Sequence, residues 1–104
     1  MNISISDFRY WLNGKRPDDV VGYSWSSNLC PVACYMRERF HATTATVSAE
    51  WWSSDGSSGR LPLWAQSFIR IMDNQSPVFT PVQVVTRRQA LQVLAVVDGE
   101  VDAY

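Results

Sequence analysis

A capping motif followed by eight mostly apolar residues constrains this fold more than any other part of the sequence. Thr86 and Gln89 are three residues apart, the spacing at which the two side chains satisfy each other's backbone N–H groups at a helix start. The eight residues that follow are apolar nearly all round, so they must be covered on more than one side or meet a partner. We predict a helix over 87–97, with a tight hairpin over 96–101 as the alternative.

Apolar residues at helical spacing predict three further helices, over 6–12, over 29–40 with Asn28 as its cap, and over 62–72. Each segment carries one apolar stripe, which we expect to be buried. The predicted core positions are Phe8, Trp11, Leu12, Leu29, Ala33, Met36, Phe40, Leu61, Trp64, Ala65, Phe68 and Met72. These stripes supply one ordinary core for a chain of 104 residues.

The strand signals are shorter. Apolar and small residues alternate over 21–25, and β-branched residues are frequent over 43–49. The segment 78–85 is an edge strand at best, because Pro81 cannot donate to a ladder. The Ser- and Gly-rich stretch 53–59 is typical of a flexible loop.

Together these elements predict a single α+β domain over 1–97, with about four helices packed on a small two- or three-stranded sheet. Residues 98–104 carry three acidic side chains and form a predicted acidic C-terminal tail. The sequence has no secretory signal at its start and no apolar run of about 18 residues, so we expect a cytoplasmic protein without a membrane span.

Two cysteines, Cys30 and Cys34, are expected to be free thiols in that compartment. Cys30 falls in the first turn of a predicted helix, where the helix dipole lowers a thiol pKa, so a thiol-dependent enzyme is one alternative function. Such a nucleophile needs a nearby histidine base. His41 is the sole histidine, and it lies about 16 Å further along the predicted helix. A small buried apolar side chain is the simpler interpretation of Cys30.

The sequence contains no motif for metal-dependent, phosphate-binding or acid–base catalysis. Cys30, Cys34 and His41 would leave a zinc ion without a fourth ligand, the glycines form no phosphate-binding loop, and the carboxylates are scattered. We therefore predict a protein that is not an enzyme and has no cofactor and no metal.

Nucleic-acid binding is a second alternative. Arg87 and Arg88 begin a predicted helix, where backbone N–H groups favour phosphate. However, the chain has a net charge of −1 and Lys15 is its one lysine, whereas nucleic-acid binders usually carry a basic patch. Nucleic acid is therefore the less favoured partner.

Five tryptophans and eight arginines favour protein binding, since both residue types are enriched at interface hot spots. Trp25, Trp51 and Trp52 flank loops, and neighbours on one strand point to opposite faces, so one of the last two must be exposed or covered by a loop. We predict a protein-binding module that uses these three side chains, with Arg37 and Arg39 as charged support. An accessory subunit or stoichiometric inhibitor, of the kind common in phages and mobile elements, fits this description. The apolar helix over 87–97 is a candidate homodimer surface.

Overall fold

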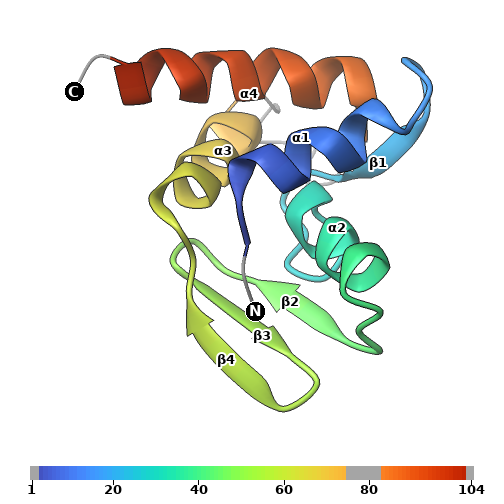
Figure 1. Ribbon diagram of the computed structural model, residues 1–104, viewed down its shortest axis with the longest axis vertical. Coiled ribbons are helices and arrows are strands. Elements are labelled where there is room, and N and C mark those ends of the chain that lie inside the picture. Colours follow the sequence, from blue (N-terminus) through green and yellow to red (C-terminus); the bar gives the residue numbers. More distant parts are fainter. Residues whose placement is uncertain (1–2, 75–82, 103–104) are drawn as a thin grey trace.

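The computed structural model describes residues 3–74 and 83–102, with side chains up to residue 99. Four helices and two small antiparallel sheets form one α+β unit, which confirms the predicted fold class (Figure 1). The elements in chain order are α1 (Ile5–Asn13), β1 (Val20–Tyr23), α2 (Pro31–Arg39), β2 (Ala45–Val47), β3 (Trp51–Ser54), β4 (Ser57–Arg60), α3 (Leu63–Asn74), β5 (Val84–Thr86) and α4 (Arg87–Asp102).

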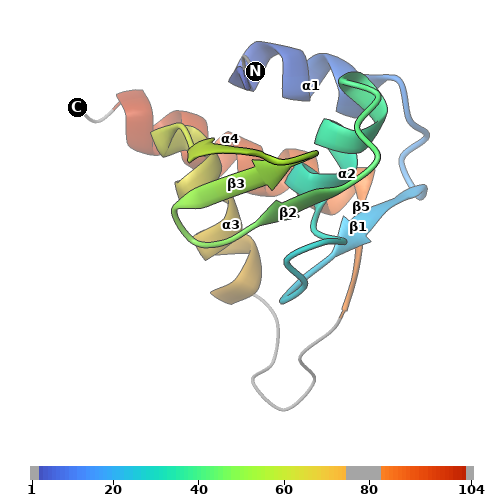
Figure 2. The ribbon, with the colours of Figure 1, turned by 90° about the horizontal axis from the view of Figure 1, so that it is seen from below.

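The strands divide into two separate sheets rather than one. β1 pairs with β5, which places Val20 opposite Thr86, and β3 is the central strand of the order β2-β3-β4. In Figure 1, α4 runs along one end of the molecule above α1 and α3, and the three-stranded sheet lies at the opposite end. Figure 2 shows β1 and β5 beside the three-stranded sheet.

The fourth helix forms as the capping motif predicts. The Thr86 N–H donates to Gln89 Oε1 at 2.9 Å, and the Gln89 N–H donates to Thr86 Oγ1 at 3.3 Å. The hairpin alternative is wrong, because the helix continues to Asp102 through residues that we expected to form an acidic tail. Asp98 forms an ion pair with Arg9 of α1. One face of α4 is buried through Ala90, Val93, Leu94 and Val97.

A cluster of aromatic rings fills the core between α1, α2 and α3. The Phe8 ring lies 5.1–5.8 Å from the rings of four neighbours, namely Trp11, Tyr35, Trp64 and Phe68. Offset and edge-to-face contacts of this kind stabilise a core beyond its buried area. The core positions predicted for Trp11 and Trp64 are confirmed, since both pack against the buried cluster.

The second helix begins later than predicted. Cys30, not Asn28, is the N-cap, since its sulfur accepts the Ala33 N–H at 3.4 Å and Pro31 occupies the first helical position. Leu29 therefore lies outside the helix, and its predicted core position is wrong because its side chain is 42% exposed. The fully buried Tyr35 fills the core from this helix.

The prediction of a flexible loop over 53–59 is also wrong. Residues 51–60 form the β3–β4 hairpin, and Asp55 and Gly56 have φ angles of 48° and 87° at its turn. An Asp-Gly pair favours this two-residue turn because both positions need a positive φ. The Asp55 carboxylate accepts the N–H groups of Thr43 and Thr44 at 3.0 and 2.8 Å, which ties the turn to the start of β2.

The strands predicted over 21–25 and 43–49 are confirmed, with different bounds. The structure contains β1 within 20–23 and β2 within 45–47. Of the segment 78–85, residues up to 82 lie outside the described residues, and Val84 and Val85 belong to β5.

Candidate partner-binding face

Three adjoining hollows form one continuous face across α3, the loop after β1 and the three-stranded sheet. The first hollow, of about 420 Å³, lies between Trp25 and α3, and the third, of about 440 Å³, lies on the sheet beside Trp51. The second hollow is smaller and lies between these two, since it shares Trp25 with the first hollow and Val47 with the third. We call this surface the tryptophan face, and its main members are Trp25, Ser27, Val47, Ser48, Ala49, Glu50, Trp51, Ser53, Leu63, Ile69, Arg70 and Asp73.

Trp25 is presented by an unusual backbone conformation. Its φ angle is 56°, in the left-handed region that bulky residues rarely adopt, and its side chain is 49% exposed. Its N–H donates to Asp73 Oδ1 at 3.0 Å, which fixes this loop to α3. Strained conformations of this kind persist where surrounding contacts hold them.

Trp51 and Trp52, which are neighbours on β3, differ in exposure as strand alternation predicts. Trp51 is 54% exposed, whereas Trp52 is partly buried and packs against the core. The Trp52 ring also lies against Gly59 of β4, where an added Cβ would approach the ring to 2.9 Å. Trp51 is therefore available for contact, and Trp52 both supports the sheet and lines the third hollow beside it.

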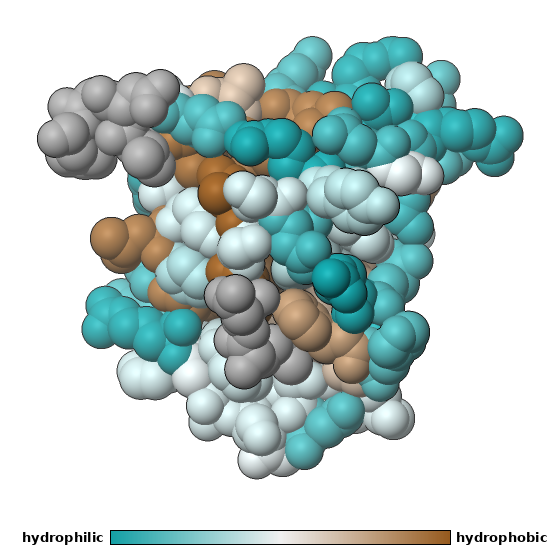
Figure 3. Space-filling view, in the orientation of Figure 1, coloured by the Kyte–Doolittle hydropathy of each residue, from teal (hydrophilic) through white to brown (hydrophobic). Residues whose placement is uncertain are grey.

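Leu63 also belongs to this face, although no sequence pattern singles it out as a contact residue. It stands at the first position of α3 and is 76% exposed. Figure 3 shows that the surface at the lower end of the molecule, over the three-stranded sheet, is mostly pale, neither strongly hydrophobic nor strongly hydrophilic.

The charged side chains of this face lie at the first hollow, and one of them, Asp73, also lines the smaller hollow. Glu50, Arg70 and Asp73 line the first hollow, and the third hollow is lined by no charged side chain. Burial raises the pKa of the Asp73 carboxyl, and the hydrogen bond from the Trp25 N–H partly opposes that rise. Burial therefore disfavours the charged form of Asp73 more than the hydrogen bond from the Trp25 N–H favours it.

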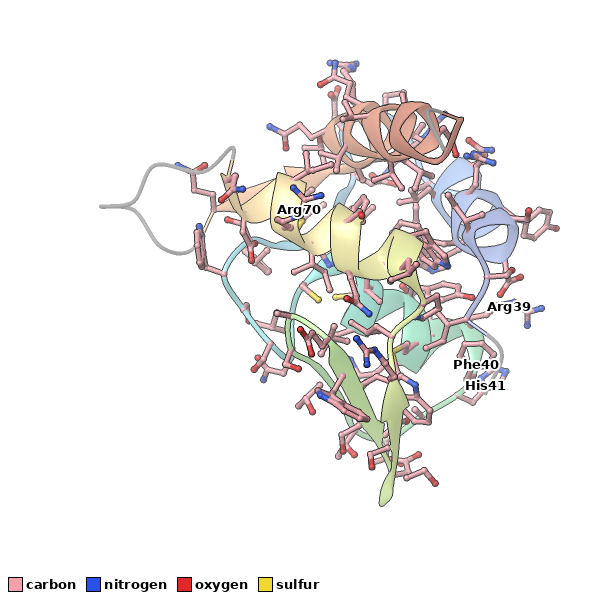
Figure 4. All side chains as sticks on the ribbon, turned by 90° about the vertical axis from the view of Figure 1, so that its left-hand side faces the viewer. Arg39, Phe40, His41 and Arg70 are labelled. Carbon is pink, nitrogen blue, oxygen red and sulfur yellow. The ribbon has the colours of Figure 1, made fainter. Side chains whose placement is uncertain are left out.

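The two arginines predicted to support the tryptophans do not line any of the three hollows. Arg37 donates to the carbonyl oxygens of Asn28 and Ala45, the second at 3.3 Å, and so holds the loop before α2 against β2. Arg39 forms an ion pair with Asp7 at 3.0 Å. Figure 4 places Arg39 beside Phe40 and His41, well apart from Arg70 on α3. Both arginines therefore have structural contacts away from the tryptophan face.

The helix start proposed for nucleic acid is already occupied by the chain itself. The N–H groups of Arg87 and Arg88 donate to the carbonyl oxygens of Asp19 and Pro17 at 3.0 and 3.1 Å. The Arg87 guanidinium donates to the Lys15 carbonyl oxygen, and Arg88 pairs with Asp18. These contacts leave this end of α4 poorly suited to a phosphate.

Cys30 is a structural residue in its observed surroundings. Both cysteines are free, as predicted, but Cys30 is buried, and burial raises its pKa to about 11. The expectation of a lowered pKa is wrong because loss of solvation outweighs the helix-start N–H groups of Val32 and Ala33. His41 lies beyond the end of α2. Within the described ranges, no three potential ligands come together as a metal site.

The apolar surface that α4 leaves exposed for the predicted homodimer is smaller than the sequence suggests. The buried face of this helix packs within its own fold, and Val96 is 48% exposed. A shallow hollow beside it is lined by Pro17, Arg87, Arg88, Leu91, Gln92 and Ala95. Self-association through α4 stays a prediction.

Among the described residues, no helix has the length and apolar character to span a membrane. Comparisons with protein-family models, curated proteins and solved structures find no match to this chain.

Proposed function

We propose that this protein is a non-catalytic binding module that holds a protein partner on the tryptophan face. One observation carries the proposal: Trp25 and Trp51, each about half exposed, come from different segments and lie on one continuous hollowed surface. Tryptophan is one of the residue types enriched among the few side chains that dominate binding energy at interfaces.

The supports beneath both tryptophans favour binding, because groups held in place before contact lose less entropy on association. Asp73 fixes the backbone of Trp25. Ser48 fixes Trp51, since its Oγ accepts the Trp51 N–H at 3.1 Å and its own N–H donates to the Trp51 carbonyl oxygen at 2.8 Å. An accessory subunit or stoichiometric inhibitor is the corresponding role, and the free thiols suit a reducing compartment such as the cytoplasm.

Capture from a lysate of the native host tests the proposal, with three immobilised proteins compared side by side. The wild type is compared with Trp25→Ser/Trp51→Ser and with Tyr10→Ser, a matched control at an aromatic residue that is 78% exposed on α1. We expect the wild type and the Tyr10 variant to retain the same partner and the double tryptophan variant to lose it. Retention by all three proteins, or by none, would contradict the proposal.

A further inference from the structure

We infer that the first hollow of the tryptophan face receives a positively charged side chain of the partner, held between the Trp25 indole and the carboxylates of Asp73 and Glu50. The inference rests on the proposed function and specifies the chemistry of its partner. It commits to a lysine or arginine side chain in a protein segment.

The lining of this hollow suits such a side chain along its whole length. Leu63 and Ile69 offer apolar contact to an aliphatic stem, and the carboxylates offer acceptors to a cationic head. An indole adds attraction, since a cation over the face of a tryptophan ring is favoured by the ring's charge distribution. A neutral apolar side chain would contact Leu63 and Ile69 but would leave the two carboxylates without a positively charged partner.

Asp73 is one of the two carboxylates that would meet this cation. No basic side chain among the described residues forms an ion pair with Asp73. Arg70 lines the same hollow, and its guanidinium offsets the charge of one carboxylate. With two carboxylates and one guanidinium, the hollow is net negative.

The position of this charge also explains how a partner would be aligned. The third hollow, around Trp51, is lined by serine, threonine, valine and tryptophan side chains. A basic residue at one end of the partner segment and neutral residues at the other would match the face in a single direction. Charge complementarity of this kind chiefly determines register and specificity.

Titration with small side-chain mimics tests the inference without knowledge of the partner. N-acetyl-L-lysine methylamide and N-acetyl-L-arginine methylamide are added to ¹⁵N-labelled protein at low salt, with N-acetyl-L-norleucine methylamide as the neutral mimic. We expect saturable shifts of the Trp25 and Asp73 signals for the cationic probes and binding about tenfold weaker for the neutral probe, a factor that corresponds to ~1.4 kcal/mol.

Two variants test whether the Asp73 carboxylate causes the stronger binding of the cationic probes. Asp73→Asn keeps an oxygen that can accept the Trp25 N–H, so the loop stays in place while the charge is lost. We expect it to weaken the cationic probes about tenfold and to leave the neutral probe unchanged. Glu38→Gln, which alters an exposed carboxylate outside the three hollows, is the matched control and should change neither.

Equal affinity for the lysine and norleucine probes, or no saturable shift with any probe, would overturn the inference. Failure here is distinguishable from failure of the proposed function. If the lysate partner is lost with Trp25→Ser/Trp51→Ser but is fully retained with Asp73→Asn, the face binds a protein and the cationic contact is wrong.

Discussion

The Trp25 N–H donates a 3.0 Å hydrogen bond to the Asp73 carboxylate, and this bond joins the loop after β1 to the last turns of α3. The two residues are 48 positions apart, so the contact exists only in the completed fold. The same carboxylate lines both the first hollow and the smaller one that joins it to the sheet. One side chain therefore positions a candidate contact residue and contributes charge to the surface where contact is proposed.

Asp73→Asn should leave the free energy of unfolding unchanged or raise it at pH 7. Burial raises the pKa of this carboxyl in the folded protein, so its charged form opposes folding above the unfolded pKa, and the opposition fades as the pH falls. Asparagine retains an acceptor for the Trp25 N–H without the charge. Urea unfolding at pH 7 and pH 4 checks this, and a stability loss that is larger at pH 7 would contradict it.

Trp51 and Trp52 should differ sharply when each is replaced by alanine. Trp51→Ala should change the free energy of unfolding by no more than about 0.5 kcal/mol, because the side chain is exposed. Trp52→Ala should cost about 2 kcal/mol, because its ring packs on the core and against Gly59. Parallel thermal and urea unfolding measure both, and equal losses would show that the two rings are equivalent.

Gly22→Ala should destabilise the protein by about 3 kcal/mol, because an added Cβ would lie 2.6–2.8 Å from backbone atoms of Leu29, Cys30 and Pro31. Those atoms belong to the start of α2 and cannot rotate away. Gly99→Ala is the matched control, since nothing lies within 4 Å of its added Cβ in α4, and it should stabilise the helix by ~0.5 kcal/mol. Urea unfolding measures both, and similar effects at the two glycines would contradict the close approach of β1 to α2.

Thiol modification should be slow at Cys34 and slower still at Cys30. Burial raises the pKa of both thiols, to about 11 for Cys30, so little reactive thiolate is present at pH 8. We expect Cys34→Ser protein to resist DTNB until it is unfolded, and Cys30→Ser protein to react slowly through its remaining thiol. Rapid reaction of native Cys34→Ser protein would restore the thiol-enzyme hypothesis.

Acid should weaken the attachment of the β3–β4 hairpin through Asp55. The N–H groups of Thr44 and Thr43 lower the pKa of Asp55 in the folded protein. Its contribution to stability is therefore complete above the unfolded value of about 3.9 and is lost as the pH falls through the lower folded pKa. We expect Asp55→Asn to be less stable than the wild type at pH 7, with the difference shrinking toward pH 2. A difference that does not change with pH would contradict this account.

The helices were predictable because their signals are local. The Thr86–Gln89 capping motif and the apolar stripe of 61–72 each act within a few residues, and both appear as predicted. The start of α2 was misplaced because Cys30 competes with Asn28 as a cap, and a thiol is an uncommon one. The hairpin over 51–60 was missed because serine-rich composition outweighed the Asp55-Gly56 turn signal.

The candidate site was only partly predictable, for a related reason. Exposure of Trp51 follows from strand alternation, which a sequence contains. The contributions of Leu63 and Asp73 depend on how α3 lies beside the loop of Trp25, which no local pattern specifies. Arg37 is a predicted contact residue, yet its guanidinium donates to the backbone carbonyl oxygens of Asn28 and Ala45, and no sequence pattern indicates such acceptors.

The pairing of β1 with β5 affects how this protein is made. Val20 has its strand partner near Thr86, and α4, which covers the core, follows directly. On the ribosome, β1 and the apolar faces of α1 and α3 emerge well before the segments that protect them. The nascent chain therefore passes through a stage with an open strand edge and an uncovered core, and this unit completes its fold only after β5 and α4 have been synthesised.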